Sequence, residues 1–192
     1  RSKQVNKKGF TILEMVVVAG IFVMVTGIIL ANLPKFRNRA SLDLTAQEVA
    51  LSIREAQVYG TATRISGNDY PSYGIHFELS GGDSNKSFIL FADLPPAGLT
   101  AGDKAYNPGE GCNSDTTECL EEYLIDGRFI IKAICVDDKQ PCFYGDSDIA
   151  ADIVFTRPFP EPTICTSNDS AICSQTNTHY NLTVVIGSSD TD

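Results

Sequence analysis

The chain has 192 residues, of which 24 are Asp or Glu and 15 are Lys or Arg, so its formal net charge is −9. This length suffices for one ordinary domain with an appendage, and the acidic balance repels phosphate backbones, so we expect no nucleic-acid partner. The sequence contains no phosphate-binding loop, dinucleotide fingerprint or HExxH helix, and only two histidines. We therefore expect neither enzymatic activity nor a cofactor.

Residues 10–33 form an apolar run in which Glu14 is the only charged residue. From Met15 to Leu33 the chain has 19 residues without a charge, enough to cross a bilayer as a helix. A secretory signal peptide would have an apolar core of about 7–15 residues, followed by a cleavage site of small residues. This run instead continues directly into "PKFRNRASLDL". We therefore expect a retained membrane helix.

The basic residues that flank the run do not fix its orientation. Four precede it and three follow it, at positions 1, 3, 7 and 8 and at positions 35, 37 and 39, a difference too small for the positive-inside rule. The six cysteines, all between Cys112 and Cys173, decide the orientation instead, because disulfides need an oxidising compartment. The part of the chain after the run is predicted to be exported, with the short basic leader left in the cytoplasm.

The start of the run carries a family resemblance. A basic leader ends in Gly9 and is followed by Phe10-Thr11-Ile12-Leu13-Glu14 and the long apolar segment. This arrangement resembles the type IV prepilin signature, which type IV pilins share with the pseudopilins of type II secretion. The resemblance implies that a prepilin peptidase cuts between Gly9 and Phe10 and methylates the new amino terminus of Phe10.

The resemblance also implies a function and a location. The expected function is a structural subunit of a type IV pilus or pilus-like filament, with other pilin subunits as partners. The chain would cross the inner membrane once before assembly and lie in an extracellular filament afterwards. The alternatives are a minor pilin that acts as a binding module, in adhesion or DNA uptake, and a pseudopilin of a type II secretion system.

Glu14 has a physical role in this interpretation. A carboxylate within a bilayer costs roughly a few kcal/mol, and no basic residue lies between Phe10 and Pro34. Cleavage would create a positively charged amine on Phe10, which can neutralise Glu14 of a neighbouring subunit when the helices assemble. A subunit out of register would leave both charges unpaired, at a cost of several kcal/mol. The alternative role is a carboxylate that reaches the membrane edge without a partner.

The sequence after Pro34 predicts that the helix continues. Apolar residues recur there at helical spacing, and they are Leu42, Ala46, Val49, Ile53 and Ala56. A single helix from Phe10 to Tyr59 would measure about 75 Å and would end near Gly60. Gly20, Gly27 and Pro34 are the positions where it is expected to bend. The stretch Ile53-Arg54-Glu55-Ala56-Gln57 resembles the H-type pseudopilin and related minor pilins.

The sequence beyond Thr61 has the periodicity of strands. In "YGIHFEL", Ile75, Phe77 and Leu79 alternate with His76 and Glu78. Further strands are predicted in "KSFILFAD", "RFIIKAICV", "ADIVFTR" and "YNLTVVIG", and an extended loop in "FTRPFPEP". Without alternating strands and helices, the sheet is predicted to be antiparallel and the fold to be α+β. The expected parts are a leader (1–9), a transmembrane or filament-core helix (10–33), its amphipathic continuation (34–60) and an extracytoplasmic β-rich domain (61–192).

The cysteines fall into three pairs that are close in sequence: Cys112 with Cys119, Cys135 with Cys142, and Cys165 with Cys173. Zinc sites usually place paired ligands two to four residues apart, whereas each of these gaps holds six or seven residues. We therefore predict three local disulfides, with buried free thiols as the alternative, and no metal. Turn-forming residues inside each loop favour these pairs among the 15 connectivities that six cysteines allow.

Two further features of the sequence are a set of aspartates and a histidine–tyrosine pair. Aspartates at positions 146, 148 and 152, or 190 and 192, are candidate calcium ligands, although they lack EF-hand spacing and are expected to form a solvated acidic loop. His179 and Tyr180 are expected to lie on the surface at a strand edge.

Overall fold

The structure is a computed structural model of the chain. It describes residues 9–62, 65, 70–80, 82–95, 101–109, 112, 117–137, 142–145, 148–159, 161–167 and 179–189. The chain divides into two compact units, residues 1–41 and residues 42–192.

A single helix, α1, extends from Ile12 to Thr61 over 50 residues. The prediction of one long helix is therefore confirmed, with its start two residues later than expected. Gly20, Gly27 and Pro34 all lie inside it. Residues 12–41 of α1 belong to the first unit, and residues 42–61 belong to the second unit together with all the strands.

In the described part of the chain, eight strands follow the helix, and every pair of neighbours is antiparallel. The first sheet has the order β3-β2-β1-β6-β7 and the second the order β5-β4-β8. The α+β prediction with an antiparallel sheet is confirmed. The bounds of the strands are β1 Ser72–Glu78, β2 Ser87–Asp93, β3 Cys119–Leu124, β4 Phe129–Val136, β5 Cys142–Tyr144, β6 Ala150–Phe155, β7 Pro162–Thr166 and β8 Leu182–Ser188.

Five of these strands were predicted from the sequence, and three were not. β3 has the sequence "CLEEYL", whose two adjacent glutamates are exposed. β5 has only three residues, and β7 begins at Pro162. A proline is tolerated at the first residue of an edge strand, and β7 is the edge of its sheet. Of the segment predicted as an extended loop, 155–162, the described residues 156–159 and 161 lie outside the strands, whereas Phe155 ends β6 and Pro162 begins β7.

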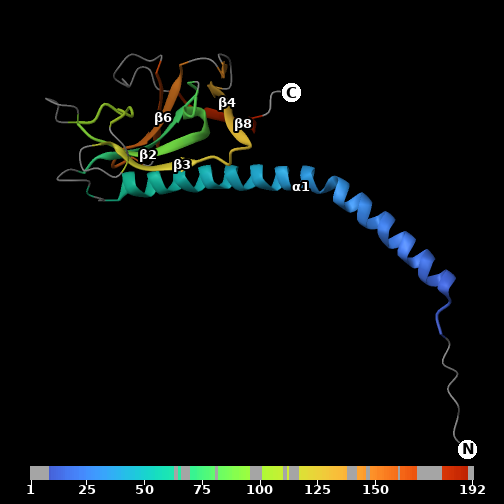
Figure 1. Ribbon diagram of the computed structural model, residues 1–192. Helices are drawn as coiled ribbons and strands as arrows, with labels where there is room; N and C mark the ends of the chain where they lie inside the picture. Colours follow the sequence, from blue (N-terminus) through green and yellow to red (C-terminus); the bar gives the residue numbers. More distant parts are fainter. Residues whose placement is uncertain are drawn as a thin grey trace, which may run out of the picture. The chain divides into compact units, whose positions relative to one another are not determined.

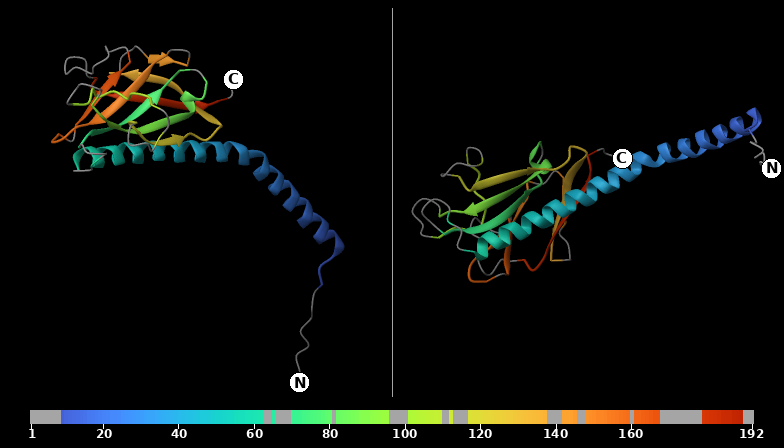
Figure 2. Two further views of the ribbon diagram at one scale, coloured as in Figure 1. Left: turned by 60° about the vertical axis from the view of Figure 1, so that its left-hand side comes forward. Right: turned by 90° about the horizontal axis from the view of Figure 1, so that it is seen from below.

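The second half of α1 lies along the sheets, as predicted, and its apolar residues help to close the core (Figures 1 and 2). Ala56 is fully buried, and Leu42, Val49 and Ile53 are partly buried against a core that includes Ile75, Phe77, Phe88, Leu90, Ile131 and Ile134. Ala46 shares this face, as predicted, and lines a cavity with Val49 and Ile53, but it is exposed. The most buried helix residues are small ones: Thr45, Ser52, Ala56 and Gly60. Small side chains let the helix approach the strands closely.

Two aromatic contacts join this part of α1 to the five-stranded sheet. The rings of Tyr59 and Tyr73 meet edge to face, with centroids 5.7 Å apart. Tyr123 of β3 donates a hydrogen bond to Glu55, with 3.2 Å between the oxygens, and its ring stacks on Phe88. The helix therefore contacts the sheet through polar side chains as well as apolar ones.

Strand β1 is buried on both faces. Tyr73, Ile75 and Phe77 face α1, and the intervening His76 is only 7% exposed on the opposite face. Tyr106, from the loop at residues 101–109, packs on the His76 ring at a centroid distance of 4.7 Å. The sequence pattern correctly placed His76 on the other face from Ile75, but it predicted neither the burial nor the loop that covers it.

Two of the three predicted disulfides are present. Cys112 is bonded to Cys119 with 4.6 Å between their Cα atoms, and Cys135 to Cys142 with 4.1 Å. The second bond joins residues directly opposite each other in β4 and β5. Cys165 is also disulfide-bonded, and its predicted partner, Cys173, lies outside the described residues.

Candidate functional site

The predicted cleavage junction lies immediately before α1. Gly9, Phe10 and Thr11 are exposed and non-helical, and the Phe10 side chain is 75% exposed. A backbone that is neither helical nor paired in a sheet is accessible to a peptidase. Residues 1–8 of the predicted leader lie outside the described part of the chain.

Thr11 caps the helix that follows. Its Oγ1 accepts a hydrogen bond from the backbone N–H of Glu14, with 3.3 Å between the two atoms. Its carbonyl oxygen accepts the first helical bond, from the N–H of Met15. A threonine followed three residues later by a glutamate is the sequence of a capping box, which satisfies backbone donors at the first turn. The spacing was visible in the sequence, but we had interpreted Glu14 only through its charge.

The carboxylate of Glu14 lies in the first turn of α1 and is exposed. A negative charge is favourable there, because the amino-terminal end of a helix carries a partial positive charge. Within the described residues, Glu14 makes no ion pair. Among the described residues, the helix dipole is thus the feature that offsets its charge.

The apolar residues after Glu14 have no covering within the chain. From Ile12 to Leu33 every residue is exposed apart from Thr26, which is intermediate. The large ones have exposed fractions between 39% for Leu33 and 86% for Ile12. Exposed apolar surface on this scale is typical of a segment that contacts a membrane or other proteins. The helix is long and apolar enough to cross a membrane, judged by its length and composition.

A separate cluster of carboxylates lies at the end of β2. Asp93 and Glu118 are 3% and 6% exposed, and with Asp103 they place one oxygen each within 4.8 Å of the others. Backbone N–H groups bond two of them: Lys104 donates to Asp93 at 3.1 Å, and Asn107 donates to Glu118 at 2.6 Å. Oxygen ligands of this kind are those that Ca²⁺ and Mg²⁺ prefer.

Burial perturbs both of the inner carboxyls. It raises the pKa of Asp93 to about 7, and the nearby charge of Asp103 acts in the same direction. Burial likewise raises the pKa of Glu118 to about 7, with added repulsion from Asp93 and Asp103. Each group is therefore partly protonated near neutral pH when no cation neutralises the cluster.

Sequence reasoning missed this cluster, because its members are 10 to 25 residues apart and follow no motif. The candidate calcium ligands chosen from the sequence lie elsewhere. Asp152 is buried in β6, where its carboxylate is bonded to His76 at 2.7 Å, and Asp148 lies in the segment before β6. Asp146, Asp190 and Asp192 fall outside the described residues. Tyr180 is 95% exposed, as expected, whereas His179 is partly buried and bonded to Asp137 at 2.7 Å.

No family model, curated protein or solved structure matches this chain.

Proposed function

We propose that the chain is a structural subunit of a type IV pilus or a related pilus-like filament, and that its subunits assemble through α1. The observation that carries the proposal is the start of the helix. An accessible Gly9-Phe10 junction leads into an exposed apolar helix of membrane-spanning length. The first turn of this helix is capped and holds Glu14, which makes no ion pair among the described residues.

In this proposal the apolar segment has two successive environments. Before assembly it crosses the inner membrane as a single helix, with the disulfide-bonded domain on the oxidising side. After assembly it packs against the same segment of neighbouring subunits, so its side chains remain away from water. Glu14 and the amine that cleavage creates on Phe10 would then form an ion pair between adjacent subunits.

Exposed apolar residues on the second half of α1 also support contact with neighbouring subunits. Leu44, Leu51 and Val58 are 65%, 66% and 59% exposed and lie seven residues apart. Apolar residues at this spacing form one stripe on a helix and are typical of helix–helix packing. An uncovered stripe is therefore a suitable contact surface for a neighbouring subunit.

Processing of the chain tests the proposal. The full chain should be produced together with a prepilin peptidase, and its intact mass measured after membrane extraction. We expect a chain that starts at Phe10 and carries one added methyl group, and an uncut chain when the peptidase is inactive. A chain that keeps residues 1–9 beside an active peptidase, while a known prepilin in the same cells is cut, would contradict the proposal.

A further inference from the structure

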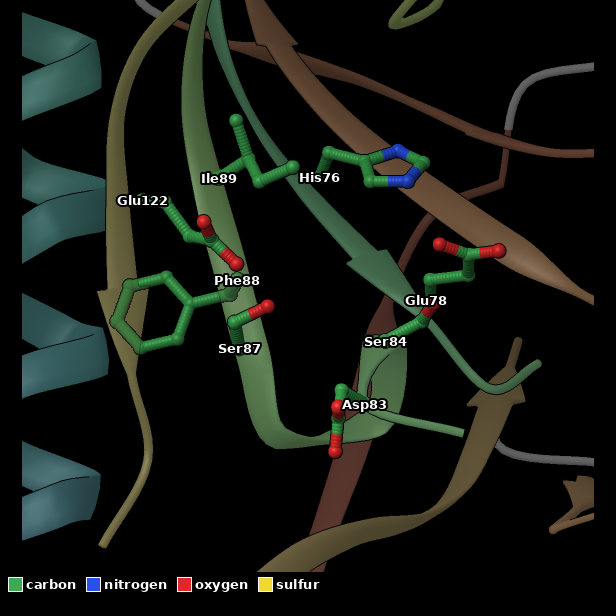
Figure 3. Close-up of a pocket in the computed structure, with 8 residues that line it drawn as sticks. All are labelled: His76, Glu78, Asp83, Ser84, Ser87, Phe88, Ile89 and Glu122. Carbon is green, nitrogen blue, oxygen red and sulfur yellow. The ribbon is translucent and has the colours of Figure 1, made fainter. Parts of the chain in front are cut away.

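The face of the five-stranded sheet opposite α1 has a pocket of about 230 Å³ (Figure 3). It lies on the same face as His76, which alternates along β1 with the core residues Ile75 and Phe77. It is separate from the carboxylates of Asp93, Asp103 and Glu118. The polar residues that line it are His76, Glu78, Asp83, Ser84, Ser87 and Glu122.

Strand pairing explains why these side chains share one pocket. His76 in β1 lies opposite Ile89 in β2, and Ile89 lies opposite Glu122 in β3. Residues opposite each other in an antiparallel pair project from the same face. Glu78 lies two residues beyond His76 in β1 and therefore projects from that face too. A histidine and two carboxylates thus border a floor formed by Ile89.

The His76 ring is held in one orientation. Its Nδ1 lies 2.7 Å from Asp152 Oδ1, and both residues are 7% exposed. The other oxygen of Asp152 accepts the backbone N–H of Tyr106 at 3.3 Å. Because a carboxylate can only accept, Nδ1 carries a proton, and in the neutral ring this leaves a lone pair on Nε2.

The Nε2 edge of the ring faces Glu78 and the pocket (Figure 3). No hydrogen bond to this nitrogen occurs within the described part of the chain, and Asp152 is the only acidic residue there that pairs with His76. Glu122 likewise makes no ion pair among the described residues. Lys86, beside the pocket, is paired with Asp83 at 2.8 Å.

The pocket therefore presents more hydrogen-bond acceptors than donors, although one oxygen of Glu78 already accepts from the Ser80 hydroxyl. Nε2 and the carboxylates of Glu78 and Glu122 only accept, and the hydroxyls of Ser84 and Ser87 can do so. Among the described residues, those that line it include no Lys or Arg. A ligand that suits it must be a hydrogen-bond donor with a positive charge.

We propose that this pocket binds the ammonium or guanidinium group of a lysine or arginine side chain presented by a partner protein. The site would make the exported domain a binding module as well as a filament subunit, and it does not depend on the filament proposal.

The spacing of the acceptors favours an organic cation over a metal ion. Metal ligands lie about 2.0–2.6 Å from the ion, so ligands on opposite sides are at most about 5 Å apart. Among the described residues, only Asp93, Asp103 and Glu118 form a group of three possible metal ligands whose ligand atoms all lie within 4.8 Å of one another. His76 belongs to no such group. The five N–H donors of a guanidinium are spread over three nitrogen atoms, so its acceptors can lie farther apart than the ligands of a single metal ion. The pocket volume is also below the roughly 300–1,000 Å³ of sites for drug-sized ligands, which suits a single side chain.

The two histidines of the chain allow a direct test. The full chain in detergent micelles should be labelled with ¹⁵N-histidine, which gives two imidazoles to follow by NMR, His76 and His179. Both have Nδ1 bonded to an aspartate at 2.7 Å, so His179 is an internal control. The probes are acetyl-Gly-Lys-Gly-amide and acetyl-Gly-Arg-Gly-amide, with acetyl-Gly-norleucine-Gly-amide as the neutral match and n-butylamine as the free amine.

We expect saturable movement of the His76 Nε2 signal with the lysine or arginine peptide, and none with the norleucine peptide. The His179 signal should not move. Replacing Glu78 or Glu122 with Gln should weaken binding about tenfold each, because a charge-assisted hydrogen bond becomes a neutral one. Glu121→Gln is the matched control, because Glu121 accepts from Tyr123 and does not line the pocket. An unchanged His179 signal in each variant shows that the fold is intact.

Four results would overturn the proposal. They are equal movement of both histidine signals, equal binding of the norleucine peptide, no movement of His76 at any peptide concentration, and binding of n-butylamine without binding of either peptide. The last result would assign the pocket to a free amine instead of a protein side chain. None of the four bears on processing at Gly9-Phe10.

Discussion

Gly60, in the last turn of α1, lies directly against the backbone of Phe155 in β6. A Cβ atom at Gly60 would lie 2.5 Å from the carbonyl oxygen of Phe155. The glycine therefore sets how closely the end of the helix approaches the sheet. A residue with a side chain at this position would overlap with the backbone of β6, so the packing requires glycine.

We expect Gly60→Ala to lower the free energy of unfolding by about 1–3 kcal/mol, the usual cost of inserting atoms into a packed contact. Gly127→Ala is the matched control, because a Cβ there would meet no atom within 4 Å. Urea unfolding of the full chain in detergent measures both. Equal stability of the two variants would show that the helix end can move away from β6 at little cost.

The acidic cluster predicts a dependence of stability on pH. The pKa of Asp93 is about 7 in the folded chain, against an ordinary value of 3.8, so the folded state binds more protons between these values. The free energy of unfolding attributable to this group therefore falls as the pH rises from about 4 to about 7, and is constant above. Glu118, raised from 4.5 to about 7, acts in the same direction.

Asp93→Asn tests this dependence, because the amide cannot ionise but can still accept from the Lys104 N–H. We expect the variant to be more stable than the wild type at pH 8, and the difference between them to shrink or reverse at pH 5. Glu161→Gln, on an exposed residue, should leave the pH profile unchanged. Thermal unfolding at both pH values measures the effect, and parallel profiles for wild type and Asp93→Asn would contradict it.

The Cys135–Cys142 bond should stabilise the smaller sheet. Closing a loop of about eight residues contributes about 2.5 kcal/mol in the chain-entropy model. We expect the double substitution to Ala to lower the free energy of unfolding by about this amount, and non-reducing peptide mapping to recover the Cys112–Cys119 link intact. A linked peptide that joins Cys112 to Cys142 in the wild type would contradict the pairing.

The long helix and five strands could be predicted because their patterns are local. The apolar run needs only its own length, and the alternation in residues 73–79 identifies the core face of β1. The strands β3, β5 and β7 were missed because adjacent glutamates, short length and Pro162 weaken a pattern of period two. The most buried residues of this part of α1, which are Thr45, Ser52, Ala56 and Gly60, were not all predicted, because their small size is not a hydrophobic signal.

The candidate site was predictable only at the start of α1, where its residues are adjacent in sequence. The Thr11–Glu14 cap follows a short motif and was visible there. Asp93 and Glu118 meet only because β2 pairs with β3, and His76 meets Asp152 only because β1 pairs with β6. Such contacts depend on register, which a single sequence does not give.

Thr11→Val separates the two roles found at the start of the helix. It removes the oxygen that accepts the Glu14 N–H but leaves the charge of Glu14 in place. Loss of an N-cap typically costs about 1 kcal/mol, and the apolar helix that follows should persist in the membrane. We expect filaments at near wild-type yield. Complete loss of filaments from this variant would mean that the cap, and not the charge, is what assembly requires.

The yield of filaments from Glu14→Val tests the proposed function most directly. The variant removes a charge from the apolar segment, so we expect wild-type amounts of the chain, cut before Phe10, in the membrane fraction. Filaments sheared from the same cells should be absent, because the amine of Phe10 would have no carboxylate to neutralise it on the neighbouring subunit. Glu48→Val, on an exposed glutamate farther along α1, should assemble more than Glu14→Val. Filaments from Glu14→Val at wild-type yield would contradict assembly through this charge pair.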